Sequence, residues 1–218
     1  MNKPGTIGVC AAALLALWIC GSKTFGVIIL CAGDSITEEA YPRYLQQIFK
    51  KEGRRARVLN YGKSGHTTGE YLKFLSGRAA KVKAEIPDLV LLQLGTNDVR
   101  VDGDRIDLQD FERNLREIVA IFRGCRSRGG GPTAVILATI PPIPENTPHP
   151  FSPESARRVV EEINPAIRAL ASELALPLVD NYALFAGAPE LLSDVHPSPE
   201  GYRRLALNWR QALRPFLD

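Results

Sequence analysis

The sequence predicts a single-domain α/β protein, a three-layer α/β/α sandwich with helices on both faces of a five-stranded parallel sheet. Short segments rich in Val, Ile and Leu alternate with longer amphipathic segments, which is the pattern of repeated βαβ units. Most of the short segments lack the polar alternation of half-exposed strands, so both of their faces are expected to be buried. The length of 218 residues suits one such domain.

The expected elements follow one another in strict alternation. Strands are predicted at residues 25–32, 57–61, 89–94, 134–140 and 178–180, and helices at 38–51, 68–83, 108–126, 153–174 and 199–213. Capping residues mark two helix starts: Asp107 precedes the third helix, and Ser152 with Pro153 opens the fourth. No internal repeat or low-complexity linker indicates a second domain, so the domain is expected to run from residue 22 to 218.

The first 21 residues have the features of a targeting segment. Lys3 precedes an apolar stretch at residues 7–20, which is short for a membrane span, and a small-residue break follows it. This pattern predicts a cleaved secretory signal and therefore an exported protein. A retained anchor is the alternative, in which case only this segment contacts the membrane. Lipidation of Cys20 is a further alternative, although Trp18 and Ile19 are bulky for that signal.

Composition and cysteine usage exclude several classes of ligand. The 27 Lys and Arg against 24 Asp and Glu give a mildly basic chain without a dense cationic run, so nucleic acid is not an expected partner. Cys31 is expected to be a core residue, and a disulfide to Cys125 is left open. Neither a His-Glu-x-x-His motif nor a clustered pair of cysteines is present, so no metal and no cofactor are predicted.

Four candidate catalytic residues follow predicted strands. Ser35 comes after the first strand, Gly65 after the second, Asn97 after the third and His196 after the fifth. Parallel strands end at one edge of the sheet, and ligands bind at that edge near the point where strand order reverses. These four residues are therefore expected to meet there.

The segments around these residues closely resemble the sequence blocks of the SGNH hydrolases, also called GDSL-type esterases and lipases. The blocks are GDSIT at residues 33–37, NYGKSG at 60–65, GTND at 95–98 and DVHP at 194–197, and the resemblance covers about residues 24–213. It implies a flavodoxin-like strand order, 2-1-3-4-5. It also implies that Ser35 is the nucleophile and His196 the base. The Ser35 amide, the Gly65 amide and the Asn97 side chain would form the oxyanion hole.

Each assignment has a simpler structural alternative. Ser35 opens a helix, where amides and the helix dipole favour negative charge, but a serine there is often only a helix cap. A neutral serine needs a base within hydrogen-bond reach. His196 is the best candidate, and His66 and His149 are expected to be substrate-loop or surface residues. Asn97 and Gly65 are alternatively turn residues, and Asp34 is expected to hold the first turn.

The position of the candidate aspartate that orients His196 departs from the family pattern. The family usually places its aspartate three residues before the histidine, where this chain has Ser193. Asp194, two residues before His196, is the best candidate for holding the imidazole tautomer. Asp180 at the end of the fifth strand and a backbone carbonyl are the alternatives. The shortened spacing predicts a weaker contribution from Asp194.

The sequence thus predicts a serine esterase that works through an acyl-enzyme. A small ester, a lipid or an acetylated carbohydrate is the expected substrate, and the loops at residues 99–105 and 141–151 are expected to wall the pocket. One alternative is an acyltransferase that uses the same site. Another is a catalytically silent, flavodoxin-like binding module. The chain lacks a Gly-x-Ser-x-Gly elbow, which argues against the α/β-hydrolase fold.

Overall fold

A computed structural model describes residues 26–103, 105–145 and 147–217. Its centre is a parallel sheet with the order β2-β1-β3-β4-β5, so the predicted order 2-1-3-4-5 is confirmed. The strands are β1 (Val27–Gly33), β2 (Ala56–Gly62), β3 (Leu89–Gln93), β4 (Ala134–Ala138) and β5 (Leu178–Val179). Strand order reverses at β1, which pairs with both β2 and β3, and this is where such sheets bind ligands.

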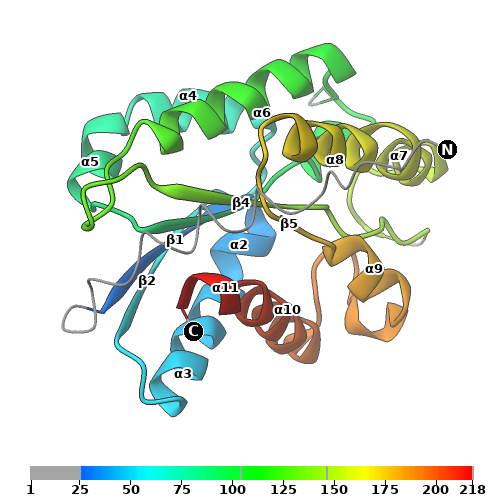
Figure 1. Ribbon diagram of the computed structural model, residues 1–218. Helices are drawn as coiled ribbons and strands as arrows, with labels where there is room; N and C mark the ends of the chain where they lie inside the picture. The colour runs from blue at the N-terminus through cyan, green and yellow to red at the C-terminus, as the bar shows by residue number, and fades with distance from the viewer. Residues whose placement is uncertain (1–25, 104, 146, 218) are drawn as a thin grey trace, which may run out of the picture.

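Helices cover both faces of the sheet, as Figure 1 shows. One layer contains α4 (Thr68–Ser76), α5 (Ala79–Ala84), α6 (Leu108–Arg123), α7 (Pro153–Arg158) and α8 (Asn164–Glu173). The other contains α3 (Tyr41–Lys51), α10 (Pro199–Ala212) and α11 (Arg214–Leu217). Two short helices, α2 (Ser35–Glu39) and α9 (Asn181–Ala186), follow β1 and β5 at the carboxyl edge of the sheet.

Alternating side chains of β1 divide the hydrophobic core into two parts. Leu30 and Ala32 pack with the α4, α6 and α8 layer, whereas Ile29 and Cys31 pack with the α3 and α10 layer. Because successive strand residues point to opposite faces, one strand serves both cores. Cys31 is buried and free, as expected of a core residue, and Cys125 is also free and belongs to the opposite core. No disulfide joins them.

Three predicted helices are interrupted in the structure. The first begins earlier, at Ser35, and divides at Ala40 into α2 and α3, with Pro42 in the first turn of α3. The second divides between α4 and α5. The fourth contains a π-helical turn at Val159–Ile163 before α8, which carries Pro165 in its first turn. Proline has no N–H and disrupts the helical turn before it, which explains the breaks at the two prolines.

Two cap predictions have different outcomes. Ser152 caps α7, where its side chain accepts a hydrogen bond from the Ser155 amide. Asp107 occupies the cap position of α6 but makes no capping hydrogen bond with its side chain. Asp180 does not end a strand; it caps α9, a helix that the sequence reading did not predict.

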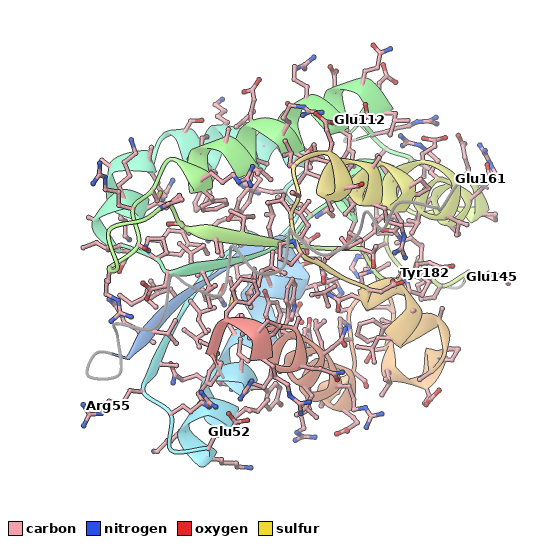
Figure 2. All side chains as sticks on the ribbon, viewed as in Figure 1. Glu52, Arg55, Glu112, Glu145, Glu161 and Tyr182 are labelled. Carbon is pink, nitrogen blue, oxygen red and sulfur yellow. The ribbon has the colours of Figure 1, made fainter. Side chains whose placement is uncertain are left out.

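Charged side chains such as Glu112 and Glu161 project from the outer faces of the helices (Figure 2). Within the described part of the chain, no helix has the length and apolar character needed to cross a membrane. The predicted signal or anchor at residues 1–21 lies outside the described residues, so the proposed start of the domain at residue 22 also stays a prediction.

Candidate active site

Ser35 lies at the first turn of α2, directly beyond β1. A Cβ atom on Gly33 would lie 2.2 Å from Thr37 Oγ1 and 2.4 Å from the Gln93 carbonyl, so only glycine fits this close turn. Asp34 is the helix cap, because its carboxylate accepts from the Ile36 amide at 3.0 Å. The structural role expected of Asp34 is confirmed. Ser35 is therefore not the cap, and its hydroxyl is available for another partner.

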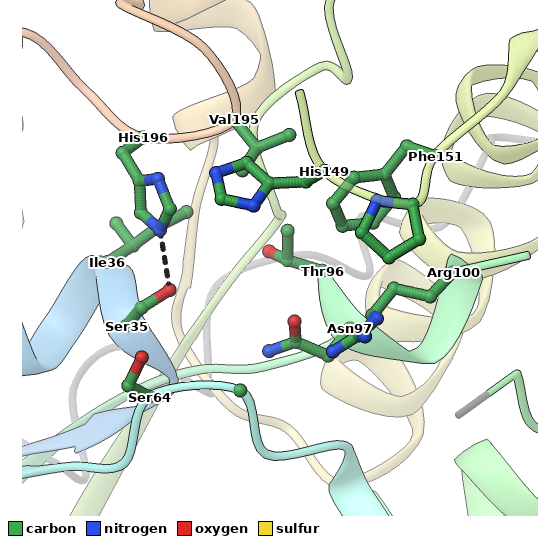
Figure 3. Close-up of a pocket in the computed structure, with 12 residues that line it drawn as sticks. Ser35, Ile36, Ser64, Thr96, Asn97, Arg100, His149, Phe151, Val195 and His196 are labelled. Carbon is green, nitrogen blue, oxygen red and sulfur yellow. Dashed lines mark hydrogen bonds between the residues drawn. The ribbon is translucent and has the colours of Figure 1, made fainter. Parts of the chain in front are cut away.

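That partner is His196. The Ser35 Oγ lies 2.9 Å from His196 Nε2, and Figure 3 draws this hydrogen bond across the pocket. The contact joins residues separated by 161 positions in sequence. It places an imidazole nitrogen where a general base must lie to accept a hydroxyl proton.

Asp194 reaches the other side of the same imidazole. Its Oδ1 lies 2.9 Å from His196 Nδ1 and also accepts from the His196 backbone N–H at 2.6 Å. The chain turns tightly here, since the Ser193 amide donates to the His196 carbonyl at 2.9 Å. The spacing of two residues therefore still brings the carboxylate to the ring.

The charge state of Asp194 fits this contact. Burial alone raises the pKa of the Asp194 carboxyl, but hydrogen bonds from the backbone and ring of His196 outweigh it and hold this pKa below its ordinary value. An ionised carboxylate only accepts hydrogen bonds, so the imidazole must carry its proton on Nδ1. Nε2 is then left with a lone pair directed at the Ser35 hydroxyl.

Asp180, the alternative acid, is engaged elsewhere. Its carboxylate accepts from Thr139 Oγ1 at 2.9 Å, from the Ala183 amide at 3.1 Å and from Arg168 Nη2 at 2.6 Å. Its place at the start of α9 explains the contact with the Ala183 amide. The structure therefore brings Asp194, and not Asp180, to His196.

The two other predicted groups face Ser35 across the cavity. Gly65 adopts a φ of +76°, a backbone conformation that glycine accommodates best. Asn97 begins a 3-10 turn (Asn97–Val99) after β3, and its Nδ2 donates to the His66 carbonyl at 3.1 Å. This hydrogen bond fixes the orientation of the amide, which still has a second N–H. Ser35, Gly65, Asn97 and His196 all line one cavity of about 130 Å³.

Glu38, which the sequence reading missed, ties the Ser35 helix to the Gly65 loop. One carboxylate oxygen accepts from Lys63 Nζ at 2.7 Å and the other from the Ser64 amide at 2.8 Å. The Glu38 carbonyl also accepts from Asn60 Nδ2 at 2.8 Å. The hydrogen bond from Lys63 is the main reason that the pKa of Glu38 is lowered. One residue of α2 thus sets the position of the loop that carries Gly65.

We expect Glu38→Ala to lower kcat roughly 10-fold with little change in KM, because small displacements of catalytic groups are costly. Glu38→Gln should lose less, since its amide oxygen still accepts from the Ser64 amide. The Glu38 side chain is 39% exposed, so little stability should be lost. Steady-state kinetics check this, with Glu173→Ala as control because it removes an exposed ion pair with Arg116. An unchanged kcat in Glu38→Ala would refute the positioning role.

Two further carboxyls are buried behind the cavity without lining it. Burial raises the pKa of Asp34 to about 6 and that of Asp98 to about 7, against hydrogen bonds that lower both. Asp98 accepts from the Thr68 hydroxyl at 2.6 Å and from the Thr68 amide, and its carbonyl accepts from Arg158 Nη1 at 3.0 Å. These contacts anchor the segment that presents Asn97.

The predicted pocket walls are also present. Arg100 from the loop at residues 99–105 lines the cavity, as do His149, Pro150 and Phe151 from the loop at 141–151. The Val101 amide donates to the Pro150 carbonyl at 2.9 Å and joins the two loops. His149 is a pocket-loop residue, as expected, and its ring centroid lies 5.3 Å from that of His196. His66, in contrast, packs edge-on against Phe74.

A serine, a histidine and an aspartate joined by hydrogen bonds at the carboxyl edge of a parallel sheet form the arrangement of a serine hydrolase. Comparison with known proteins gives the family. The GDSL-like Lipase/Acylhydrolase family matches residues 31–204, which is most of the chain. The chain therefore belongs to this family.

Individual relatives are distant but cover most of the chain. An acetylxylan esterase from Xylanibacter ruminicola is 26% identical over 84% of this chain and 42% of its own length. A multidomain esterase from Ruminococcus flavefaciens is 24% identical over 90% of this chain and 30% of its own length. The chain thus spans less than half the length of these curated relatives. A GDSL-like lipase from Bacteroides thetaiotaomicron has the same fold, with a TM-score of 0.67, 24% identity and coverage of 87% and 89% of the two chains.

Proposed function

We propose that this protein is a serine esterase that hydrolyses carboxylic esters through an acyl-enzyme. The observation that carries the proposal is the 2.9 Å contact between Ser35 Oγ and His196 Nε2, with Asp194 on the opposite ring nitrogen. Family membership supports the same chemistry. The predicted roles of Ser35, His196 and Asp194 are part of this proposal.

The first half-reaction forms the acyl-enzyme. Ser35 Oγ attacks the ester carbonyl carbon while its proton passes to His196 Nε2. Asp194 stabilises the resulting imidazolium without taking the proton. The carbonyl oxygen becomes an oxyanion, and in this proposal the Ser35 and Gly65 amides and the Asn97 side chain stabilise it. The tetrahedral intermediate then expels the alcohol, which takes the proton from His196.

Water completes the cycle by the same route. It attacks the acyl carbon as His196 Nε2 removes one of its protons, and the second tetrahedral intermediate collapses with return of that proton to Ser35 Oγ. The carboxylic acid leaves and the enzyme is regenerated. Both half-reactions use the same serine, histidine and aspartate.

We expect Asn97→Ala to lower kcat about 10²- to 10³-fold with little change in KM, because its amide acts mainly on the oxyanion. Steady-state kinetics with a p-nitrophenyl ester provide the measurement. Thermal unfolding serves as the control, since Asn97 also donates to the His66 carbonyl. A change confined to KM would instead make Asn97 a substrate-binding or turn residue.

The proposed substrate is a short acyl ester, with an acetylated carbohydrate as the leading class. A cavity of about 130 Å³ is small beside the roughly 300–1,000 Å³ of pockets that enclose drug-sized ligands. Ile36, Phe151 and Val195 wall it with apolar surface. The curated relative named acetylxylan esterase supports an acetyl group on a sugar.

A panel of p-nitrophenyl esters of increasing chain length, with acetylated xylan and lysophospholipid, tests this substrate class. We expect the highest kcat/KM for the acetyl ester and release of acetate from acetylated xylan. A preference for long acyl chains or for lysophospholipid would overturn it. Acyl transfer to an added sugar in place of hydrolysis would identify an acyltransferase.

Export of the protein is also a proposal. It rests on Lys3 and the apolar stretch at residues 7–20, which have the features of a secretory signal. Determination of the amino terminus of the protein after expression in its host tests cleavage near residue 21. An intact amino terminus in the membrane fraction would indicate a retained anchor.

A further inference from the structure

Two of the three histidines of the chain converge on one carboxylate. Asp194 lies between His196, through Nδ1 and Oδ1 at 2.9 Å, and His149, whose Nε2 lies 3.5 Å from Asp194 Oδ2. Figure 3 shows a ring nitrogen of His149 directed toward His196. The esterase mechanism uses the contact with His196 and leaves His149 without a role.

The donor atoms of these three residues have the spacing of a transition-metal site. One ligand atom from each residue lies within 4.8 Å of the other two. Ligand atoms of a tetrahedral zinc ion, each at about 2.0–2.1 Å from the metal, lie roughly 3.3 Å apart. His196 Nδ1 lies 2.9 Å from Asp194 Oδ1, and His149 Nε2 lies 3.5 Å from the other carboxylate oxygen, Oδ2, so both distances are close to that value. The side chain of His149 is 41% exposed, so its ring has room to turn toward a bound ion.

The donor set also selects the class of ion. Imidazole nitrogens suit Zn²⁺, Ni²⁺ and Cu²⁺, whereas Mg²⁺ and Ca²⁺ prefer sites made only of oxygen atoms. We propose that His149, Asp194 and His196 bind a Zn²⁺-type ion, with the fourth position left for water.

Such an ion would switch the esterase off, a consequence that rests on the proposed function. A metal on Nδ1 displaces the proton from that nitrogen, and the neutral imidazole then carries its remaining proton on Nε2. Nε2 faces Ser35, so the atom that must accept the serine proton is already protonated. Asp194 is drawn to the metal at the same time. Zn²⁺ is therefore an inhibitor of this site and not a cofactor.

Isothermal titration calorimetry of the full chain with Zn²⁺ tests the site without reference to activity. His149→Ala should weaken binding on the order of 100-fold, because loss of a ligand costs at least as much as loss of an outer partner. His66→Ala is the matched control and should bind as tightly as the wild type. Asp194→Ala should weaken Zn²⁺ binding to a similar degree. It serves as the test variant if His149→Ala destabilises the loop at residues 141–151.

Ser35→Ala separates the metal site from the catalytic proposal. Ser35 is not a ligand, so this inactive variant should still bind Zn²⁺, and Mg²⁺ should not compete. In the active enzyme, Zn²⁺ should inhibit hydrolysis, chelation should reverse the inhibition, and His149→Ala should require about 100-fold more Zn²⁺. Equal Zn²⁺ affinity in His149→Ala and the wild type, or no binding by the wild type, would overturn the metal site whatever the esterase assays give.

Discussion

Replacing Ser35 with alanine is expected to lower kcat by about 10⁴-fold or more and to leave the fold intact, because Ser35 is the proposed carrier of the acyl intermediate. The hydroxyl is not the cap of α2, since Asp34 accepts the capping hydrogen bond. Its loss should therefore cost the helix little. Single-turnover and steady-state kinetics, together with thermal unfolding, provide the measurement.

Ser64 supplies the matched control for this variant. It lines the same cavity, but its backbone N–H, and not its hydroxyl, bonds to Glu38. Ser64→Ala should therefore retain most of the activity. Normal turnover by a folded Ser35→Ala protein would remove the basis of the acyl-enzyme mechanism.

His196→Ala should be about as damaging as Ser35→Ala, because a nucleophile and its base act as a unit. Asp194→Asn is expected to cost about 10⁴-fold, since an amide that donates to Nδ1 would favour the wrong imidazole tautomer. The short spacing by itself predicted a smaller loss. The 2.9 Å contact between Asp194 Oδ1 and His196 Nδ1 supports the larger value.

Asp180→Asn is the control for this pair, because Asp180 was the alternative acid and its carboxylate bonds to Arg168 and Thr139. Its kcat should stay near that of the wild type. Rates measured across pH for the three variants separate the possibilities. A harmless Asp194→Asn would mean that the serine and histidine act as a dyad or that another group orients the ring.

The strands and the edge of the sheet that carries the site were predictable from local sequence. Buried parallel strands have a strong apolar signal, and their carboxyl ends must meet at one edge. Ser35, Gly65, Asn97 and His196 follow different strands, so connectivity alone brings them together. Proline disrupts a helical turn, so the helix breaks at Pro42 and Pro165 could have been predicted. They were missed because the amphipathic pattern continues across both positions.

The contacts between loops could not be predicted from the sequence. His149 reaches Asp194 because the loop at residues 141–151 is joined to the neighbouring loop through the Val101 amide, and no periodic pattern encodes such a contact. Glu38 appeared to be an ordinary polar residue of a helix. Its role became visible only when the Lys63–Gly65 loop was placed beside α2.

Reaction with a fluorophosphonate followed by peptide mass spectrometry tests most directly whether His196 activates Ser35. We expect one covalent adduct per chain, located on Ser35, and labelling that is slowed by orders of magnitude in His196→Ala. Ser64, in the same cavity, should stay unmodified. Absence of an adduct, or an adduct on another serine of a folded protein, would rule out activation of Ser35 by His196.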